Sequence, residues 1–225
     1  MSIYDYSVPT PDGTDLDLKQ YEGKVIMIVN TATGCGFTPQ YEDLEQIYHD
    51  CHDKGLEIID IPCNQFKGQT PGTDEEIHEF CTLTYHTEFP QMRKSDVNGE
   101  HALDLYTYLK SQRPFEGFGR GAKAFAMSVM LKRIDRNYKS NPDIKWNFTK
   151  FLVDGDGRQV GQHDHGGRDE PPAAHPPDIR PEGVRGPGER RAGVRHPCVQ
   201  RPVAEGHQEH RDEAEQQDRG HVGAD

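Results

Sequence analysis

The fold is decided by residues 24–48, KVIMIVNTATGCGFTPQYEDLEQIY. Residues 24–32 form a continuous apolar run with β-branched side chains, which is typical of a strand that is covered on both faces. Apolar side chains then recur at helical spacing, at Tyr41, Leu44, Ile47 and Tyr48. Between the two patterns lies Cys35, flanked by glycines and without a second cysteine two residues later. The segment therefore predicts a strand that runs into a helix, with a lone thiol at the junction.

The rest of the first 160 residues alternates strand and helix patterns around this junction. Residues 3–18 alternate about Pro11-Asp12-Gly13, which predicts a leading β-hairpin. Further along the chain we expect a second buried strand at 56–66, a helix at 74–86 capped by Thr73 or Asp74, an amphipathic helix at 98–112 and a final hairpin at 144–160. This order predicts an α/β fold with a central mixed sheet flanked by helices.

Composition changes near residue 160. The chain has 225 residues, of which 32% are hydrophobic, and a mean hydropathy of −0.91. A chain of this composition is too polar to fold as one uniform globular domain. Residues 161–225 contain no Lys, Leu, Phe, Tyr, Trp, Met or Asn, so they cannot bury enough apolar surface to offset chain entropy. We expect a folded domain at 1–160 and a low-complexity, disordered tail at 161–225.

The charge and the N-terminus exclude several classes of protein. A net charge of −12 argues against nucleic acid as a partner. No apolar run approaches the roughly 18 residues that a membrane span needs. The N-terminal residues MSIYDYSVPTPDG lack the pattern of a signal peptide, so we expect a cytoplasmic protein with no membrane partner.

The cysteines give no sign of a metal or a cofactor. None of those in residues 1–160 forms a C-x-x-C pair, which argues against a thioredoxin-type dithiol and against a zinc site. Cys35 is a candidate nucleophile, because functional groups of open α/β sheets collect at the carboxyl ends of strands. Free N–H groups and the helix dipole at such a junction favour a thiolate. The alternative is a small buried hydrophobic residue, although the flanking glycines favour the first interpretation.

Three blocks of sequence go beyond a generic α/β protein. They are VNTATGCGFTPQYEDLE (29–45), DIPCNQFKGQTPGTDEEIHEFC (60–81) and IKWNFTKFLVDGDG (144–157). In this order and spacing they strongly resemble the glutathione peroxidase family, over residues 3–160. The resemblance implies a thioredoxin-like fold. It also implies reduction of hydrogen peroxide and organic hydroperoxides, as in the response to oxidative stress.

The resemblance also implies roles for individual residues. Cys35 matches the peroxidatic position, and Gln69, Trp146 and Asn147 match the residues that complete a catalytic tetrad. Their amide and indole N–H groups are neutral donors that can hold a thiolate and a departing oxygen. Cys81 matches the resolving cysteine of cysteine-type members, which resemble thioredoxin-dependent more than glutathione-dependent enzymes. The helix around Cys81 would have to unwind partly for its sulfur to meet that of Cys35.

Two regions depart from the family pattern. Residues 115–143 form an insert with a further helical pattern, at Ala122, Phe125, Ala126, Val129 and Met130. This helix either packs on its own domain or forms a subunit contact, so the oligomeric state stays open. After residue 160 the resemblance stops. The domain should therefore lack the family's final strand and helix, which suggests a frameshifted C-terminus.

The expected function is a thiol peroxidase that uses Cys35 and Cys81 and is recycled by thioredoxin or glutathione. Two alternatives belong to other classes. One is a non-enzymatic redox sensor that relays a disulfide to a partner, and the other is an inactive truncated or frameshifted product.

Overall fold

The computed structural model describes residues 1–113, 115, 117–118 and 122–164. Their elements, in chain order, are η1 (Ile3–Asp5), β1 (Ser7–Pro9), β2 (Asp15–Asp17), η2 (Leu18–Tyr21), β3 (Val25–Thr31), α1 (Gln40–Cys51), η3 (His52–Lys54), β4 (Leu56–Pro62), α2 (Asp74–Tyr85), α3 (Asp104–Gln112), α4 (Ala122–Ile134), β5 (Lys150–Val153) and β6 (Gln159–His163). This order follows the predicted alternation of strands and helices.

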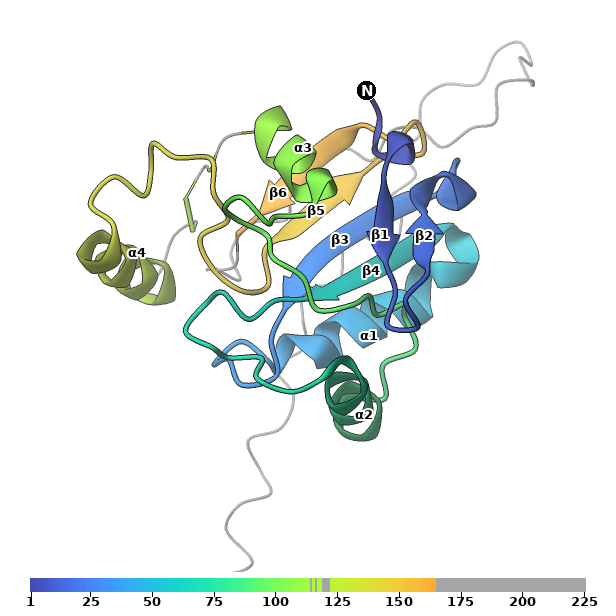
Figure 1. The fold of residues 1–225 in the computed structure, drawn as a ribbon, viewed down its shortest axis with the longest axis horizontal. Helices are drawn as coiled ribbons and strands as arrows, with labels where there is room; N and C mark the ends of the chain where they lie inside the picture. Colours follow the sequence, from blue (N-terminus) through green and yellow to red (C-terminus); the bar gives the residue numbers. More distant parts are fainter. Residues whose placement is uncertain (114, 116, 119–121, 165–225) are drawn as a thin grey trace, which may run out of the picture.

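Within the described residues, the central sheet has four strands in the order β4-β3-β5-β6 (Figure 1). Strand β3 runs parallel to β4 and antiparallel to β5, and β5 pairs antiparallel with β6. The β1–β2 hairpin forms a separate two-stranded sheet. The predicted mixed sheet and the N-terminal hairpin are therefore confirmed.

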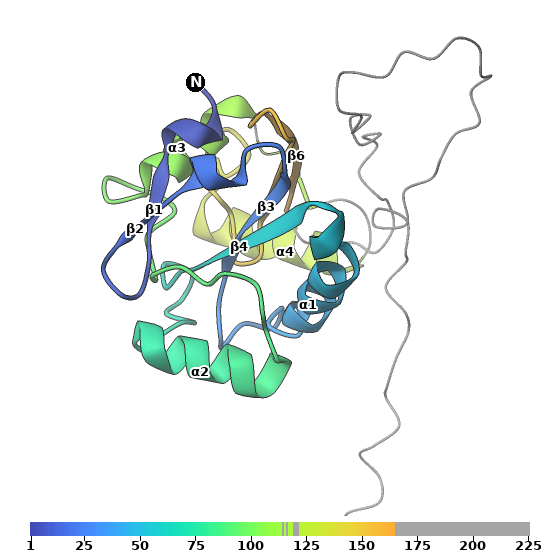
Figure 2. The same ribbon diagram turned by 90° about the vertical axis from the view of Figure 1, so that its right-hand side faces the viewer.

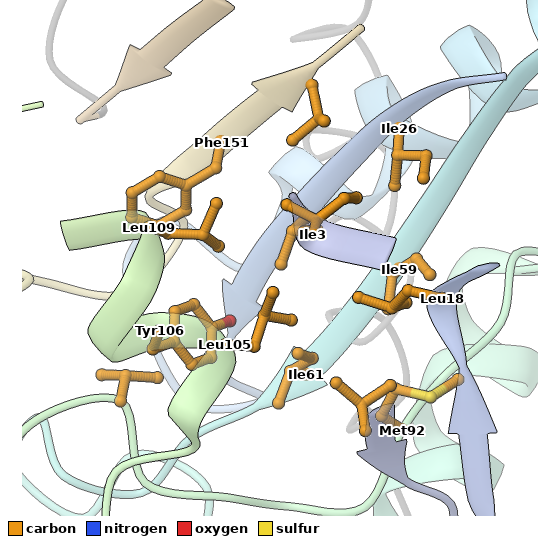
Figure 3. Packing of buried hydrophobic residues seen from close by; sticks show 14 of the residues in the cluster. Ile3, Leu18, Ile26, Ile59, Ile61, Met92, Leu105, Tyr106, Leu109 and Phe151 are labelled. Carbon is orange, nitrogen blue, oxygen red and sulfur yellow. The ribbon is translucent and has the colours of Figure 1, made fainter. Parts of the chain in front are cut away.

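One face of the sheet packs against α3 and the N-terminal hairpin (Figures 2 and 3). The sheet contributes alternate residues such as Ile26 on β3 and Ile59 on β4, because side chains alternate between the faces of a strand. Leu105 and Tyr106 on α3 contact the same cluster. The apolar period of the strands thus places α3 over this face.

The opposite face packs against α1, α2 and α4. Val29 and Ile58 supply this face of the sheet, and Tyr41, Ile77 and Met127 come from the three helices. Cys35, Cys81 and Trp146 belong to the same buried cluster. The residues to which the resemblance gives chemical roles therefore gather on this face.

Local signals set the ends of two helices. The Thr73 hydroxyl accepts a hydrogen bond from Glu76 N (3.3 Å), and the Glu76 carboxylate accepts one from Thr73 N (2.8 Å). This capping box begins α2 and identifies Thr73 as the cap. Gly55 ends the η3 turn after α1 with a φ of 94°, which glycine adopts without strain.

Helix α4 buries a different face from the predicted one. The stripe with Phe125 and Val129 was expected to pack, but Phe125 is 72% exposed. Ala124, Met127 and Leu131 are buried instead. The helix carries apolar side chains on adjoining faces, so spacing alone did not identify the packed one. Subunit contact through 115–143 stays a prediction.

The final hairpin extends past the predicted domain boundary at 160. Strand β6 pairs with β5 from Gln159 to His163, so the hairpin has a second arm although we expected the family's final strand to be lacking. The expected disorder of the tail, the missing final helix and the frameshift concern residues 165–225, outside the described part of the chain. The boundary at 160 stays a prediction.

Replacing Thr73 with Ala removes one half of the capping box that begins α2. We expect a loss of about 1 kcal/mol in the free energy of unfolding, because the Glu76 N–H loses its partner. Urea titration followed by circular dichroism measures this loss. Thr82→Ala, at an exposed site within the same helix, is the matched control and should be neutral or slightly stabilising. Equal destabilisation by both variants would contradict the role of the cap.

Candidate active site

Cys35 lies in the turn that joins β3 to α1, and it is 7% exposed. Its N–H donates to the Thr38 hydroxyl (2.9 Å), which in turn donates to the Ala32 carbonyl (2.8 Å). The Phe37 N–H donates to the Cys35 sulfur at 3.4 Å. Helix α1 begins only at Gln40, so the donor at the sulfur comes from the turn rather than from the first turn of the helix. The thiol is thus held in a loop of fixed geometry.

Gln69 joins the turn of Cys35 to the segment of Asn147. The Gln69 carbonyl accepts from Gly34 N at 2.8 Å, and the Gln69 Oε1 accepts from Asn147 Nδ2 at 2.9 Å. A Cβ at position 34 would lie 3.2 Å from the Gln69 carbonyl oxygen, so glycine permits this close approach. Asn147 is fully buried, and its Oδ1 has no hydrogen-bond partner within the described chain. These contacts bring Gln69 and Asn147 together beside the turn of Cys35.

Trp146 packs beside the loop that follows β4. Its side chain is largely buried, its ring centroid lies 5.7 Å from that of Phe66, and Lys67 Nζ lies 5.6 Å from its ring centroid. The Trp146 carbonyl accepts from Asn30 Nδ2 at 3.1 Å. In this conformation the Phe37 N–H donates to the Cys35 sulfur, and among the described residues no side chain of Gln69, Trp146 or Asn147 does so. Trp146 and Cys35 share one apolar cluster without a direct polar contact among the described residues.

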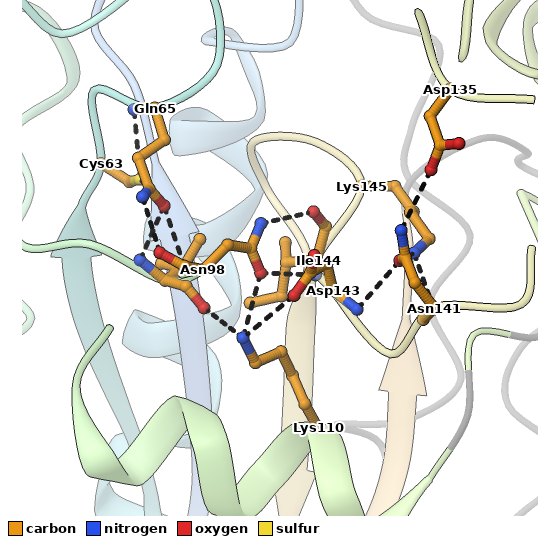
Figure 4. A network of polar contacts seen from close by, with 10 residues as sticks. Cys63, Gln65, Asn98, Lys110, Asp135, Asn141, Asp143, Ile144 and Lys145 are labelled. Carbon is orange, nitrogen blue, oxygen red and sulfur yellow. Dashed lines mark hydrogen bonds and ion pairs between the residues drawn. The ribbon is translucent and has the colours of Figure 1, made fainter. Parts of the chain in front are cut away.

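A polar network fixes the segment that precedes Trp146 (Figure 4). Asn98 Oδ1 accepts from Ile144 N (2.9 Å), and Asn98 Nδ2 donates to the Ile144 carbonyl (2.8 Å). Lys110 on α3 donates to Asn98 Oδ1 (3.1 Å), and Gln65 Oε1 accepts from the N–H of Asn98 (2.9 Å). Sequence analysis missed these residues. The sequence predicted Asn98 to begin a helix at 98–112, but α3 begins at Asp104, and nothing in the pattern indicated a clamp on a segment more than forty residues away.

Cys81 lies on α2 with a fully buried side chain, and Gln91 Nε2 donates to its sulfur at 3.4 Å. Burial, together with the nearby Asp60 carboxylate, raises the pKa of the Cys81 thiol to about 11. Burial also raises the pKa of Cys63 to about 11. Cys35 and Cys81 are both free thiols, so their pairing stays a prediction. In this conformation Cys81 is a protonated thiol that is shielded from solvent.

Nothing in the described residues fits a membrane span or a metal site. No helix there has the length and apolarity to cross a membrane. No group of three or more His, Cys, Asp or Glu side chains in that part of the chain is arranged to hold a metal ion.

A thioredoxin-like fold with a lone thiol at its first strand-to-helix junction defines the class of thiol-dependent oxidoreductases. The family model described as glutathione peroxidase matches residues 3–110. A glutathione peroxidase homolog of Neisseria meningitidis is 44% identical over 160 residues, 71% of this chain and 89% of the relative. Glutathione peroxidase-like peroxiredoxin 2 of Saccharomyces cerevisiae is 45% identical over 159 residues, 71% of this chain and 85% of the relative.

Solved structures agree with these relatives. The crystal structure of T. cruzi GPX1 is 30% identical, with a TM-score of 0.53, and the match covers 74% of this chain and 88% of that one. The crystal structure of Trgpx in its apo form is 32% identical, with a TM-score of 0.52, and the match covers 72% of this chain and 84% of that one. This chain belongs to the glutathione peroxidase family. The predicted family, the thioredoxin-like fold and the peroxidase class are confirmed.

Asn98→Ala should loosen the segment that carries Trp146, because Ile144 loses partners for both its N–H and its carbonyl. We expect a loss of about 1–3 kcal/mol in the free energy of unfolding. The emission of Trp146 should also change, and it reports this segment directly because the chain has a single Trp. Gln112→Ala, at an exposed position of α3, is the control. Unchanged emission and stability in Asn98→Ala would show that the clamp does not position Trp146.

Proposed function

We propose that this chain reduces hydrogen peroxide and organic hydroperoxides at Cys35, that Cys81 resolves the oxidised thiol, and that thioredoxin or glutathione recycles the enzyme. The observation that carries the proposal is the pair of hydrogen bonds made by Gln69. Through them the turn of Cys35 and the segment of Trp146 and Asn147 are joined at one point. Residues from the three blocks of sequence that carry the family resemblance thus lie together, which supports the proposal.

In the first step the Cys35 thiolate attacks one oxygen of the peroxide. The O–O bond breaks, sulfur gains that oxygen as a sulfenic acid, and the other oxygen leaves as water or an alcohol after taking a proton. The leaving oxygen carries the developing negative charge. The amide of Asn147 and the indole of Trp146 supply neutral donors for that charge, with Gln69 holding the Asn147 amide.

In the second step the Cys81 thiol attacks the sulfenic sulfur of Cys35. A disulfide forms, and the oxygen of the sulfenic acid leaves as water with the thiol proton. Because the Cys81 side chain is fully buried on α2, this step requires local opening of that helix. A dithiol reductant or two thiol molecules then reduce the disulfide.

Both reductants belong to the proposal. The relatives include proteins named glutathione peroxidase and others named glutathione peroxidase-like peroxiredoxin, which supports a thiol reductant without choosing one. A cytoplasmic location is also part of the proposal.

Cys35→Ser should abolish peroxide consumption, because Cys63 and Cys81 are fully buried and burial raises the pKa of each thiol to about 11. Cys81→Ser should complete one turnover and then stop when thioredoxin is the reductant, because the sulfenic acid has no internal partner. Peroxide-dependent NADPH oxidation measures both, run with thioredoxin and its reductase beside glutathione and its reductase. Cys63→Ser, which changes another buried thiol, is the control and should cycle. An unchanged steady-state rate in Cys81→Ser would refute the resolving role.

Asn147→Ala should slow formation of the sulfenic acid by about 100-fold, since it removes one preorganised donor near the leaving oxygen. Single-turnover measurement of peroxide loss isolates this step from recycling. Asn137→Ala, at an exposed position after α4, is the control. A normal first step in Asn147→Ala would remove Asn147 from the catalytic machinery.

A further inference from the structure

Strand β4 carries a carboxylate that the proposed peroxidase chemistry does not use. Asp60 is 0% exposed and is held by three side chains. The Thr31 hydroxyl donates to Oδ1 at 2.5 Å, while the Tyr41 hydroxyl and Gln91 Nε2 donate to Oδ2 at 3.1 and 2.9 Å. None of the ion pairs within the described residues includes Asp60.

The titratable groups that face Asp60 come from three helices and are all weak acids. They are Tyr41 on α1, Cys81 on α2 and Tyr106 on α3. Burial raises the pKa of each, so all three are neutral at pH 7 and none offers a positive charge. Burial therefore raises the pKa of Asp60 from 3.8 to about 6, in spite of its three hydrogen bonds. At neutral pH the sheet holds an ionised carboxylate without a counter-charge.

Gln91 connects this carboxylate to Cys81. Its Nε2 donates both to Asp60 Oδ2 (2.9 Å) and to the Cys81 sulfur (3.4 Å). The backbone of Gln91 pairs with that of Asp60 in a parallel bridge, so the Gln91 side chain starts from a fixed position beside β4. The Gln91 Oε1 is buried without a partner among the described residues. The Gln91 side chain therefore links the Cys81 thiol on α2 to the Asp60 carboxylate on β4.

We propose that Asp60 is a positioning residue for the resolving step: its ionised carboxylate weakens the packing of α2 over β4 and so allows Cys81 to leave its buried place. This inference rests on the proposed role of Cys81. Asp60 acts on the packing of α2 through Gln91 and Tyr41, and its charge raises the pKa of Cys81 only in the closed form, in which the thiol does not react. The family resemblance assigned no role to Asp60, Tyr41 or Gln91.

The direction of the effect follows from proton binding. Closed α2 binds the Asp60 proton more tightly than open α2, in which the carboxyl is hydrated and has its ordinary pKa. Protonation therefore stabilises the closed form fully below about pH 3.8, and this stabilisation is lost as the pH rises through about 6. The difference of about two pKa units limits the gain in the opening equilibrium to about 100-fold.

The chemistry of the resolving step is unchanged by Asp60. The Cys81 S–H and the Cys35 S–OH exchange partners, an S–S bond forms, and water leaves with the thiol proton. No electron or proton has to reach Asp60. Its charge changes only how often Cys81 is exposed to react.

Asp60→Asn is the variant that tests this inference, because it keeps the shape and removes the charge. The Gln91 amide can turn so that its unpartnered Oε1 accepts from the new amide. We expect an unchanged rate of sulfenic acid formation. Disulfide formation should be slower at about pH 7.5, by up to about 100-fold, and should lose its rise between about pH 4.5 and 6.5. Rapid acid quench and mass spectrometry measure both species.

Glu57→Gln is the matched control, since Glu57 is also a buried carboxylate of β4 but pairs with Lys24. It should keep the wild-type profile of disulfide formation. Equal rates of disulfide formation in Asp60→Asn and the wild type across this pH range would overturn the inference.

A second measurement separates this inference from the proposed function. In a Cys35→Ser background, iodoacetamide labelling of Cys81 reports opening of α2 without peroxide, with each rate divided by that of the urea-unfolded chain. Slower labelling in Asp60→Asn than in the parent variant supports the role of Asp60. If peroxide forms no Cys35–Cys81 disulfide, that result contradicts only the resolving role of Cys81 and leaves the labelling result standing. If Asp60→Asn does not fold, the same labelling is measured on the chain that keeps Asp60. A normalised rate of Cys81 labelling that does not change from about pH 4.5 to 6.5 overturns the inference.

Discussion

The site depends on the way one buried amide holds the 146–149 segment against β3. Asn30 Nδ2 donates to the Trp146 carbonyl, and its Oδ1 accepts from Thr149 N at 3.1 Å. Its backbone adds hydrogen bonds to Phe148 and Thr149, so the pairing of β3 with β5 continues past the strand. The same strand leads into the turn of Cys35. One strand therefore sets the positions of both the thiol and the donors, and replacing Asn30 would leave several buried groups unpaired.

The sequence predicts features that depend on neighbouring residues better than contacts between residues far apart in the chain. Buried strands and a cap at Thr73 or Asp74 are local signals, and the structure confirms the strands and identifies Thr73 as the cap. The clamp of Asn98 on Ile144 joins residues far apart in the chain, so no periodic pattern marks it. Gln69 is an ordinary loop residue by composition, and only the family resemblance made it a candidate. Helix α4 was located correctly, but its packed face depends on neighbours that spacing does not specify.

Three cysteines of one chemical type have different surroundings. Cys35 lies in a turn that directs a backbone N–H at its sulfur. Cys63 also receives a backbone N–H at its sulfur, from Gln65 at 3.5 Å, but Cys63 and Cys81 are both fully buried, and burial raises the pKa of each to about 11. Thiol reactivity follows the thiolate fraction and access, so the two buried thiols are protected from peroxide in the closed form. The order of the proposed steps, first Cys35 and then Cys81, thus follows from where the fold puts each thiol.

The site must stay rigid while α2 opens, and the contacts are distributed in a way that permits both. Gln69, Asn30 and Asn98 fix the proposed catalytic segments by hydrogen bonds to the sheet side and to α3. Helix α2 instead has two buried residues, Ile77 and Cys81, with Phe80 and Tyr85 partly buried beside them. Exposing one Ile side chain costs roughly 1.5–3 kcal/mol, which is small enough for transient local opening. An uncompensated charge under this helix lowers that cost further, and it does so without loosening the hydrogen bonds that hold Gln69 and Asn147.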